Sequence, residues 1–211
     1  MINPTGFSIL ISSIRIAAER LAGHFYVKSI GPHITVMGSA RISEDNPLYL
    51  EALQTGAKIA KTTYSVLTGG GPGMMQASNQ GAYETDQNKS YGVSIKIPRE
   101  QKANPFLKKN LLCHFFCSRK YLLLQYCDAI VFLPGGYGTL DELFEALTLI
   151  KTFHLESKPL ILINKEFWQP VLDHLHTLAT SYHTISEDEM DLISIINIEE
   201  LDDALAKIHR K

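Results

Sequence analysis

The segment from Phe132 to Glu142 carries more chemical information than any other part of the chain. An apolar run ends there in a glycine-rich turn, which opens into an apolar helical pattern. Backbone N–H groups at the start of a helix are unpaired and lie at the positive end of its dipole, so such a turn can bind a phosphate. We expect the carboxylate of Glu142 to lie beside that phosphate. The residues expected to bind it are Gly135, Gly136, Tyr137, Gly138 and Thr139.

The same segment also has a purely structural interpretation. Thr139 and Glu142 have the spacing of a capping box, in which two side chains satisfy the first backbone N–H groups of a helix. A cap of this kind requires none of the glycines of the turn. Asp141 and Glu145 also form a like-charged i, i+4 pair, which is unfavourable on an isolated helix. Both features favour a phosphate site over a plain helix cap.

The first glycine cluster in chain order is Thr68–Met75, which follows another apolar run, and the turn at Pro134–Glu142 is the second. The first cluster is not a P-loop, because Gly73 is followed by Met74 instead of Lys and Ser or Thr. It is not a dinucleotide fingerprint either, because Gln76 occupies the place of the third small residue. A tight turn in which glycine only relieves steric strain is an equally good interpretation. If the cluster is functional, the nucleotide-binding residues are Gly70, Gly71, Gly73 and Met74.

Two further segments carry arginines at the ends of predicted strands. Arg119 can bind a phosphate or a carboxylate through two parallel hydrogen bonds, and a position at a helix start would be electrostatically poor for a cation without a ligand. A basic side chain packed along the helix start is the alternative. Lys120 is interpreted as solvated or supporting. Ser39 and Arg41 are candidate nucleotide contacts, although a small-residue turn with a surface arginine explains them equally well.

Apolar runs alternate with helical patterns along the chain, which predicts an α/β fold: a doubly wound parallel sheet covered by helices on both faces. Ligands bind such sheets beyond the carboxyl ends of the strands, where the glycine clusters fall. Residues 1–30 are predicted to form an N-terminal helical extension to a domain spanning 31–211, and Pro98–Asn110 a long loop near the site. Predicted strands are Ile34–Met37, Tyr64–Leu67, Tyr91–Ile97, Leu111–Phe116, Ala129–Leu133, Leu160–Ile163 and Leu192–Ile196; predicted helices are Leu48–Lys61, Met74–Tyr83, Arg119–Tyr126, Thr139–Thr152, Phe167–Thr180 and Ile198–His209.

Composition excludes several classes of function. The 20 basic and 22 acidic residues leave no basic stripe for nucleic acid, and no apolar run is long enough for a membrane span. Cys113, His114 and Cys117 resemble metal ligands, but no second ligand pair follows at zinc-site spacing, so we interpret the three cysteines as buried thiols and expect no metal. A reducing cytoplasm fits this cysteine usage.

Together, Met37–Arg41, Gly69–Met75, Arg119-Lys120 and Pro134–Glu142 resemble the LOG ("Lonely Guy") family of cytokinin-activating proteins, long labelled lysine-decarboxylase-like. The resemblance implies a Rossmann-like fold, a homodimer, and hydrolysis of the N-glycosidic bond of nucleoside 5′-monophosphates to free base and ribose 5-phosphate, without a cofactor. It also implies that Arg119 and Glu142 are catalytic and that Gly135–Thr139 hold the phosphate. Plant-type members carry an acidic residue where this chain has Ser118.

The alternative is a non-catalytic nucleotide-binding protein or molybdenum-cofactor carrier of similar fold. Both functions use the glycine turns, but only the hydrolase requires Arg119 and Glu142 together. In a homodimer, we expect the Arg119 helix and the helix after Glu142 to contribute to the interface.

Overall fold

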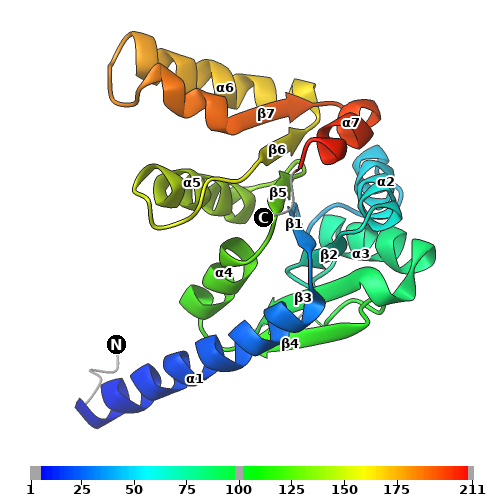
Figure 1. The fold of residues 1–211 in the computed structure, drawn as a ribbon, viewed down its shortest axis with the longest axis vertical. Coiled ribbons are helices and arrows are strands. Elements are labelled where there is room, and N and C mark those ends of the chain that lie inside the picture. Colours follow the sequence, from blue (N-terminus) through cyan, green and yellow to red (C-terminus); the bar gives the residue numbers. More distant parts are fainter. Residues whose placement is uncertain (1–5, 98–101, 209–211) are drawn as a thin grey trace.

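The computed structural model describes residues 6–97 and 102–208. Its centre is a single sheet in which every strand pair is parallel, with the order β4-β3-β2-β1-β5-β6-β7 (Figure 1). The order reverses between β1 and β5, and the crevice outside such a reversal is where open α/β sheets bind ligands. The strands are β1 (His33–Met37), β2 (Ser65–Thr68), β3 (Ser90–Ile95), β4 (Lys109–Cys113), β5 (Ala129–Phe132), β6 (Leu160–Ile163) and β7 (Ile193–Ile196).

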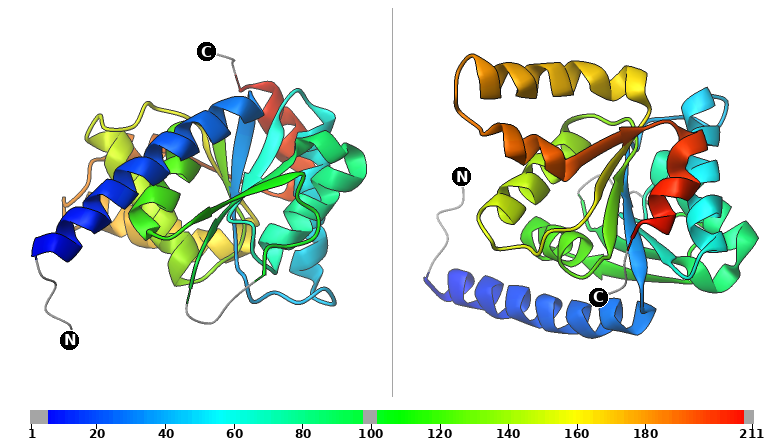
Figure 2. Two further views of the ribbon diagram at one scale, coloured as in Figure 1. Left: turned by 90° about the horizontal axis from the view of Figure 1, so that it is seen from below. Right: turned by 45° about the horizontal axis from the view of Figure 1, so that its top comes forward.

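Helices cover both faces of the sheet, as Figure 2 shows from two sides. Helices α1, α4, α5 and α6 contribute to one buried cluster and α2, α3 and α7 to the other. The predicted doubly wound, Rossmann-like architecture is therefore confirmed. The helices are α1 (Gly6–Ile30), α2 (Pro47–Lys61), α3 (Met74–Thr85), α4 (Phe116–Gln125), α5 (Tyr137–Lys151), α6 (Lys165–Thr180) and α7 (Leu201–Ala206), with short 3₁₀ turns η1 (Gln87–Lys89), η2 (Glu187–Leu192) and η3 (Ile198–Glu200).

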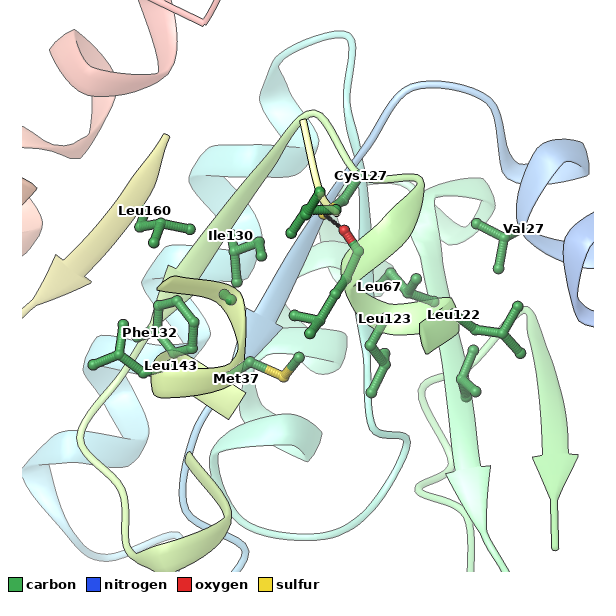
Figure 3. Close-up of a cluster of buried hydrophobic side chains, with 14 of the residues drawn as sticks. Val27, Met37, Leu67, Leu122, Leu123, Cys127, Ile130, Phe132, Leu143 and Leu160 are labelled. Atoms are coloured by element: carbon green, nitrogen blue, oxygen red, sulfur yellow. Dashed lines mark hydrogen bonds between the residues drawn. The ribbon is translucent and has the colours of Figure 1, made fainter. Parts of the chain in front are cut away.

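Strand β5 shows why the two cores are separate. Its side chains alternate across the sheet, so Ile130 and Phe132 enter the cluster under α4 and α5, while Val131 enters the cluster under α2 and α3. Figure 3 shows the first cluster, where Phe132 lies close to Leu143 of α5 and Leu123 of α4 lies beside the sheet. Because both faces are buried, the strand reads as a continuous apolar run in the sequence.

Helix α1 packs on the outside of the sheet edge and extends beyond it (Figure 1). Its carboxyl-terminal part is anchored by Val27 and Ile30, which belong to the buried core, while Ile14 and Leu21 are largely exposed. The structure thus contains the helix predicted for residues 1–30, from Gly6 onward. Within the described residues, no helix combines the length and the apolarity needed to cross a bilayer.

The sequence prediction was wrong at the boundary between β4 and α4. Strand β4 ends at Cys113, and Phe116 begins α4 instead of ending the strand, so Arg119 lies one turn inside the helix. The apolar pair at 115–116 suggested a buried strand, but Phe116 is exposed on the first turn of α4. Arg119 is therefore the fourth helical residue, at the end of the first turn of α4, where the unfavourable field of the helix start is weaker than at the predicted position.

Two other predicted segments differ in detail. The predicted loop Pro98–Asn110 contains residues 98–101, which lie outside the described part, and its end belongs to β4. The helix predicted for Ile198–His209 is divided into η3 and α7, and His209 also lies outside the described part.

The three cysteines are free thiols in the structure. Cys113 and Cys127 are buried as predicted, whereas Cys117 is exposed on the first turn of α4, so the interpretation was wrong for Cys117. Among the described residues, no three His, Cys, Asp or Glu side chains cluster in a way that could hold a metal ion.

Two glycines allow α2 and α3 to pack in direct backbone contact. A Cβ atom on Gly56 of α2 would lie 1.9 Å from the carbonyl oxygen of Ser78, and a Cβ atom on Gly81 of α3 would lie 1.9 Å from that of Leu53. Both neighbours are backbone atoms, which cannot move aside as a flexible side chain can. The close crossing fixes α3, and with it the glycine turn that precedes α3.

We expect Gly56→Ala and Gly81→Ala each to lower the free energy of unfolding by about 1–3 kcal/mol, because the added methyl group forces the helices apart. Gly138→Ala is the matched control: its Cβ atom meets nothing within 4 Å in the first turn of α5, and alanine reduces the entropy of the unfolded chain. Urea denaturation measures all three variants. Wild-type stability of Gly56→Ala and Gly81→Ala would contradict the close-packing argument.

Candidate active site

Three loops at the carboxyl ends of β1, β2 and β5 are joined by backbone hydrogen bonds. The N–H group of Ser39 donates to the carbonyl oxygen of Pro134 at 3.2 Å, and the N–H group of Met74 donates to that of Ser39 at 2.9 Å. The turn after β1 thus connects the two glycine clusters. The structure brings all three predicted loops to the strand-order reversal, where the fold is expected to bind a ligand.

The first glycine cluster is explained partly by backbone conformation. Gly70 and Gly73 have φ values of +69° and +68°, which favour glycine. A Cβ atom on Gly73 would also lie 2.5 Å from the carbonyl oxygen of Ser39. The N–H group of Gly70 donates to Thr68 Oγ1 at 2.9 Å, and its carbonyl oxygen accepts from the N–H group of Asn104 at 3.0 Å. Both polar groups of Gly70 are therefore engaged within the protein.

The second glycine turn does not form a capping box. Helix α5 begins at Tyr137, two residues before the predicted start, and its N-cap is Gly136. No side chain caps this first turn, whereas α2 and α6 are capped by Asn46 and Asn164. Within the described part of the chain, the backbone N–H groups of this turn therefore have no side-chain acceptor.

The glycines of this turn serve two purposes. A Cβ atom on Gly135 would lie 2.1 Å from Thr139 Oγ1, so glycine is required there for the turn to close. Gly136 and Gly138 are exposed, and a Cβ atom on either would meet nothing within 4 Å. Their lack of side chains keeps the turn accessible to an anion.

Arg119 reaches from α4 to the space between the glycine turns. Its Nε donates to the carbonyl oxygen of Val93 at 3.0 Å, which fixes the direction of the guanidinium. Nη2 lies over Gly69, because a Cβ atom on that glycine would be only 2.0 Å from it. Nη1 lies 3.5 Å from Glu142 Oε1, and the two side chains are 12% and 11% exposed. The structure therefore places the two predicted catalytic residues in contact.

The environment of Glu142 is unusual for a carboxylate. Burial is the largest influence and raises its pKa to about 7, although the positive charge of Arg119 opposes this increase. Asp141 and Glu145 raise the pKa further, and Lys120 lowers it. The cost of removing the carboxylate from water thus exceeds the attraction to Arg119 at this distance. A carboxyl group that titrates near neutral pH is suited to proton transfer.

Lys120 explains the like-charged pair on α5. Its Nζ lies 2.8 Å from Asp141 Oδ2 and 2.7 Å from Glu145 Oε2, so one cation bridges both acids. The side chain is 19% exposed, which makes it a supporting residue and not a solvated one. The sequence signal for this contact was the unfavourable pair itself, but the partner on another helix was not identified.

The remaining predicted residues lie on the same rim with different degrees of exposure. Ser39 Oγ accepts a hydrogen bond from the N–H group of Arg41 at 3.2 Å, and the Arg41 side chain is exposed. Met74 is fully buried beneath the first helical turn of α3. Sequence reasoning did not select Gly69, although it lies in the recognised cluster, because only the fold shows that Arg119 packs against it.

The fold and this site define a Rossmann-like protein with a buried Arg–Glu pair beside an uncapped glycine turn. A family profile described as "possible lysine decarboxylase" matches residues 75–208, and the chain belongs to this family, which is the LOG family. The rice (Oryza sativa subsp. japonica) protein named cytokinin riboside 5′-monophosphate phosphoribohydrolase LOG is 30% identical over 146 residues, 67% of this chain and 59% of that protein.

Two further curated relatives have related names. A cytokinin riboside 5′-monophosphate phosphoribohydrolase of Rhodococcoides fascians is 39% identical over 67 residues, covering 31% of this chain and 33% of that protein. A pyrimidine/purine nucleotide 5′-monophosphate nucleosidase of Escherichia coli K12 is 24% identical over 150 residues, covering 68% of this chain and 33% of that protein. The matches thus cover less than two thirds of these relatives.

Solved structures agree on the fold. The molybdenum cofactor binding protein of Rippkaea orientalis superposes with a TM-score of 0.62 at 22% identity, covering 84% of this chain and 96% of that protein. At this identity the likeness shows the shared architecture alone.

The raised pKa of Glu142 predicts a pH-dependent stability. Folding raises this pKa from 4.5 to about 7, so ionisation favours the unfolded state once the pH exceeds the unfolded value. Ionisation of Glu142 should therefore lower the free energy of unfolding of the wild type between about pH 5 and pH 7. Glu142→Gln lacks this contribution, because glutamine does not ionise. We expect Glu142→Gln to gain about 3 kcal/mol relative to wild type on going from about pH 4 to about pH 8, measured by urea denaturation. A pH-independent difference would contradict the assigned environment.

Proposed function

We propose that this protein hydrolyses the N-glycosidic bond of a nucleoside 5′-monophosphate, either AMP-like or a cytokinin riboside monophosphate, to a free base and ribose 5-phosphate. The observation that carries the proposal is the buried contact between Arg119 and Glu142 beside the uncapped turn of α5. Membership of the LOG family and the names of the phosphoribohydrolase and nucleosidase relatives support it.

In this proposal the phosphate binds to the backbone N–H groups of Gly135–Thr139, with the Gly69–Met74 turn on the opposite side. The phosphate does not react, and its binding energy positions the anomeric carbon of the ribose. Arg119, held by the Val93 carbonyl, contacts the substrate or orients Glu142. The base lies toward Met75 and the Phe115–Phe116 segment, which are at least partly exposed at the start of α3 and α4.

The reaction breaks the bond between the anomeric carbon and the base nitrogen, and the bonding electron pair leaves with the base. The ribosyl group then carries positive charge, which the carboxylate of Glu142 stabilises in a site with little water. A water molecule attacks the anomeric carbon and gives up a proton, for which Glu142 is the base. The leaving base gains a proton from solvent or from the site.

The alternative function is nucleotide or molybdenum-cofactor binding without catalysis, which the shared fold with the Rippkaea orientalis protein permits. A carrier needs the anion-binding turn but has no use for a carboxylate buried next to it, because an acid repels an anionic ligand. The Arg119–Glu142 contact therefore favours the hydrolase. For the homodimer, exposed Phe116 of α4 and Phe144 of α5 mark the faces that we propose for the interface.

The direct test is to incubate the purified protein with AMP, CMP, GMP and isopentenyladenosine monophosphate and to quantify the free base. We expect Arg119→Ala and Glu142→Gln each to lower kcat by about 100-fold or more. Glu142→Gln removes the negative charge that stabilises the ribosyl cation, and Arg119→Ala removes the group that contacts the substrate or orients Glu142. In the wild type, kcat should rise with pH through about 7 as Glu142 ionises.

Glu200→Gln is the matched control for these variants. Glu200 follows the edge strand β7 and pairs with Lys165 of α6, away from the glycine turns. Its loss should therefore leave base release unchanged. Full turnover by Glu142→Gln would refute the catalytic role. Tight nucleotide binding without base release by the wild type would favour the carrier.

Gly69 provides an independent test of the position of the guanidinium. In Gly69→Ala, the new methyl group would lie 2.0 Å from Arg119 Nη2 and 2.7 Å from Met75 Sδ, so both flexible side chains must move. We expect kcat to fall by about 10-fold or more with little change in the melting temperature, because moving the guanidinium by about 1 Å or more impairs alignment.

A double-mutant cycle with Arg119→Ala separates this effect from general damage. If Gly69 acts through Arg119, Gly69→Ala should cost nothing further in the Arg119→Ala background. Additive losses would show that Gly69 affects activity by another route.

A further inference from the structure

Two neighbouring residues of α4 contact neighbouring positions of α5. Arg119 contacts Glu142, and Lys120 bridges Asp141 and Glu145, which precede and follow Glu142 in the sequence. Asp141 and Glu145 are one helical turn apart and therefore lie on the same side of α5, next to the row that carries Glu142. Among the described residues, these three ion pairs are those that join α4 to α5.

We propose that Lys120 is a positioning residue of this site: by bridging Asp141 and Glu145, it fixes α5 against α4 and sets the orientation and charge surroundings of Glu142. The bridge itself is independent of any reaction, whereas its effect on turnover rests on the proposed function. In this proposal Lys120 does not contact the substrate. It affects the reaction only through the position and protonation of Glu142.

The strength of the bridge follows from its geometry and burial. Both Lys120 contacts are shorter than the 3.5 Å contact between Arg119 and Glu142. The lysine is four-fifths buried and Glu145 two-thirds buried, so solvent screens this pair less than an ordinary surface pair. The lysine side chain holds two acids at once, which an isolated salt bridge does not do. The Asp141 side chain is 61% exposed, so the contact with Glu145 is the better shielded of the two. The two shorter contacts of Lys120 thus hold α5 against α4 in the register that the longer Arg119–Glu142 contact requires.

The bridge also contributes to the charge near Glu142. The groups facing it are Arg119 and Lys120 from α4 and Asp141 and Glu145 from its own helix. The two cations lower the pKa of Glu142 and the two acids raise it. Removing Lys120 takes away the cation shared by Asp141 and Glu145 and leaves only Arg119 to lower the pKa of Glu142. Neutralising the two acids removes the charges that raise this pKa and leaves both cations. The two changes should therefore shift the titration of Glu142 in opposite directions.

The test compares four proteins: wild type, Lys120→Met, Lys120→Arg, and the double variant Asp141→Asn/Glu145→Gln. The first readout is the pKa of Glu142, followed through the ¹³C shift of its carboxyl carbon in glutamate-labelled protein and assigned by the signal missing in Glu142→Gln. The second readout is the pH profile of base release from AMP. Lys165→Met is the matched control, because Lys165 also pairs with a glutamate but lies on α6.

For Lys120→Met we expect the pKa of Glu142 and the acid limb of kcat to move upward by about one pH unit, with a loss of kcat at neutral pH. For the double acid variant both should move downward, and Lys120→Arg should restore the wild-type profile. A bridge that only stabilises the fold would lower the melting temperature of Lys120→Met without moving either profile, and that result would overturn the proposal. An unchanged carboxyl titration in both variants would overturn it as well.

The two readouts keep the two proposals apart. If the wild type releases no base from any nucleotide, the hydrolase proposal fails, yet the carboxyl titrations still decide whether Lys120 controls Glu142. If the wild type is active but Lys120→Met has an unshifted profile and wild-type kcat, the role of Lys120 fails and the hydrolase stands.

Discussion

The site depends on one unfavourable arrangement, a carboxylate buried beside a guanidinium at 3.5 Å. At that distance and burial the attraction does not compensate for the loss of water, and the pKa of Glu142 rises to about 7. Near neutral pH the carboxyl group is therefore partly protonated, instead of being a permanent anion. Every neighbouring feature bears on this balance: the carbonyl that holds Arg119, the glycine that makes room for it, and the lysine that separates two further acids.

The fold creates this arrangement from elements distant in sequence. Arg119 comes from the helix after the edge strand β4, and Glu142 from the helix after the central strand β5. They meet because both helices cover the same face of the sheet and start at the same edge. The first glycine cluster then approaches from β2, and Gly69 lets the guanidinium lie against its backbone. Backbone hydrogen bonds through Ser39 keep the β1, β2 and β5 turns together.

The sequence predicted the sheet well because buried parallel strands are continuous apolar runs with glycine turns at their carboxyl ends. It also predicted Arg119 and Glu142 as partners, through the family pattern. It failed where local signals conflict with tertiary contacts. The apolar pair at 115–116 suggested a strand, although the edge strand ends at Cys113. The helix predicted to start at Thr139 begins two residues earlier, at Tyr137, because the glycine turn closes onto Thr139. The bridging role of Lys120 depends on two helices packing together, which periodicity cannot show.

The three helices that start around the Arg–Glu pair lack side-chain caps. Helices α2 and α6, which lie away from the pair, have asparagine caps, whereas α3, α4 and α5 have none in the described part of the chain. Helix α7 also lacks a cap of its own, but it follows the capping box of η3. An uncapped helix start loses about 1 kcal/mol relative to a capped one, so the absence of caps at these helix starts weakens the free protein. A bound anion can satisfy the same N–H groups. The buried acid and the uncapped helix starts both lower the stability of the free protein. A nucleoside monophosphate would offset both costs, because its phosphate can bind to the free N–H groups and its sugar lies where the acid can act on it.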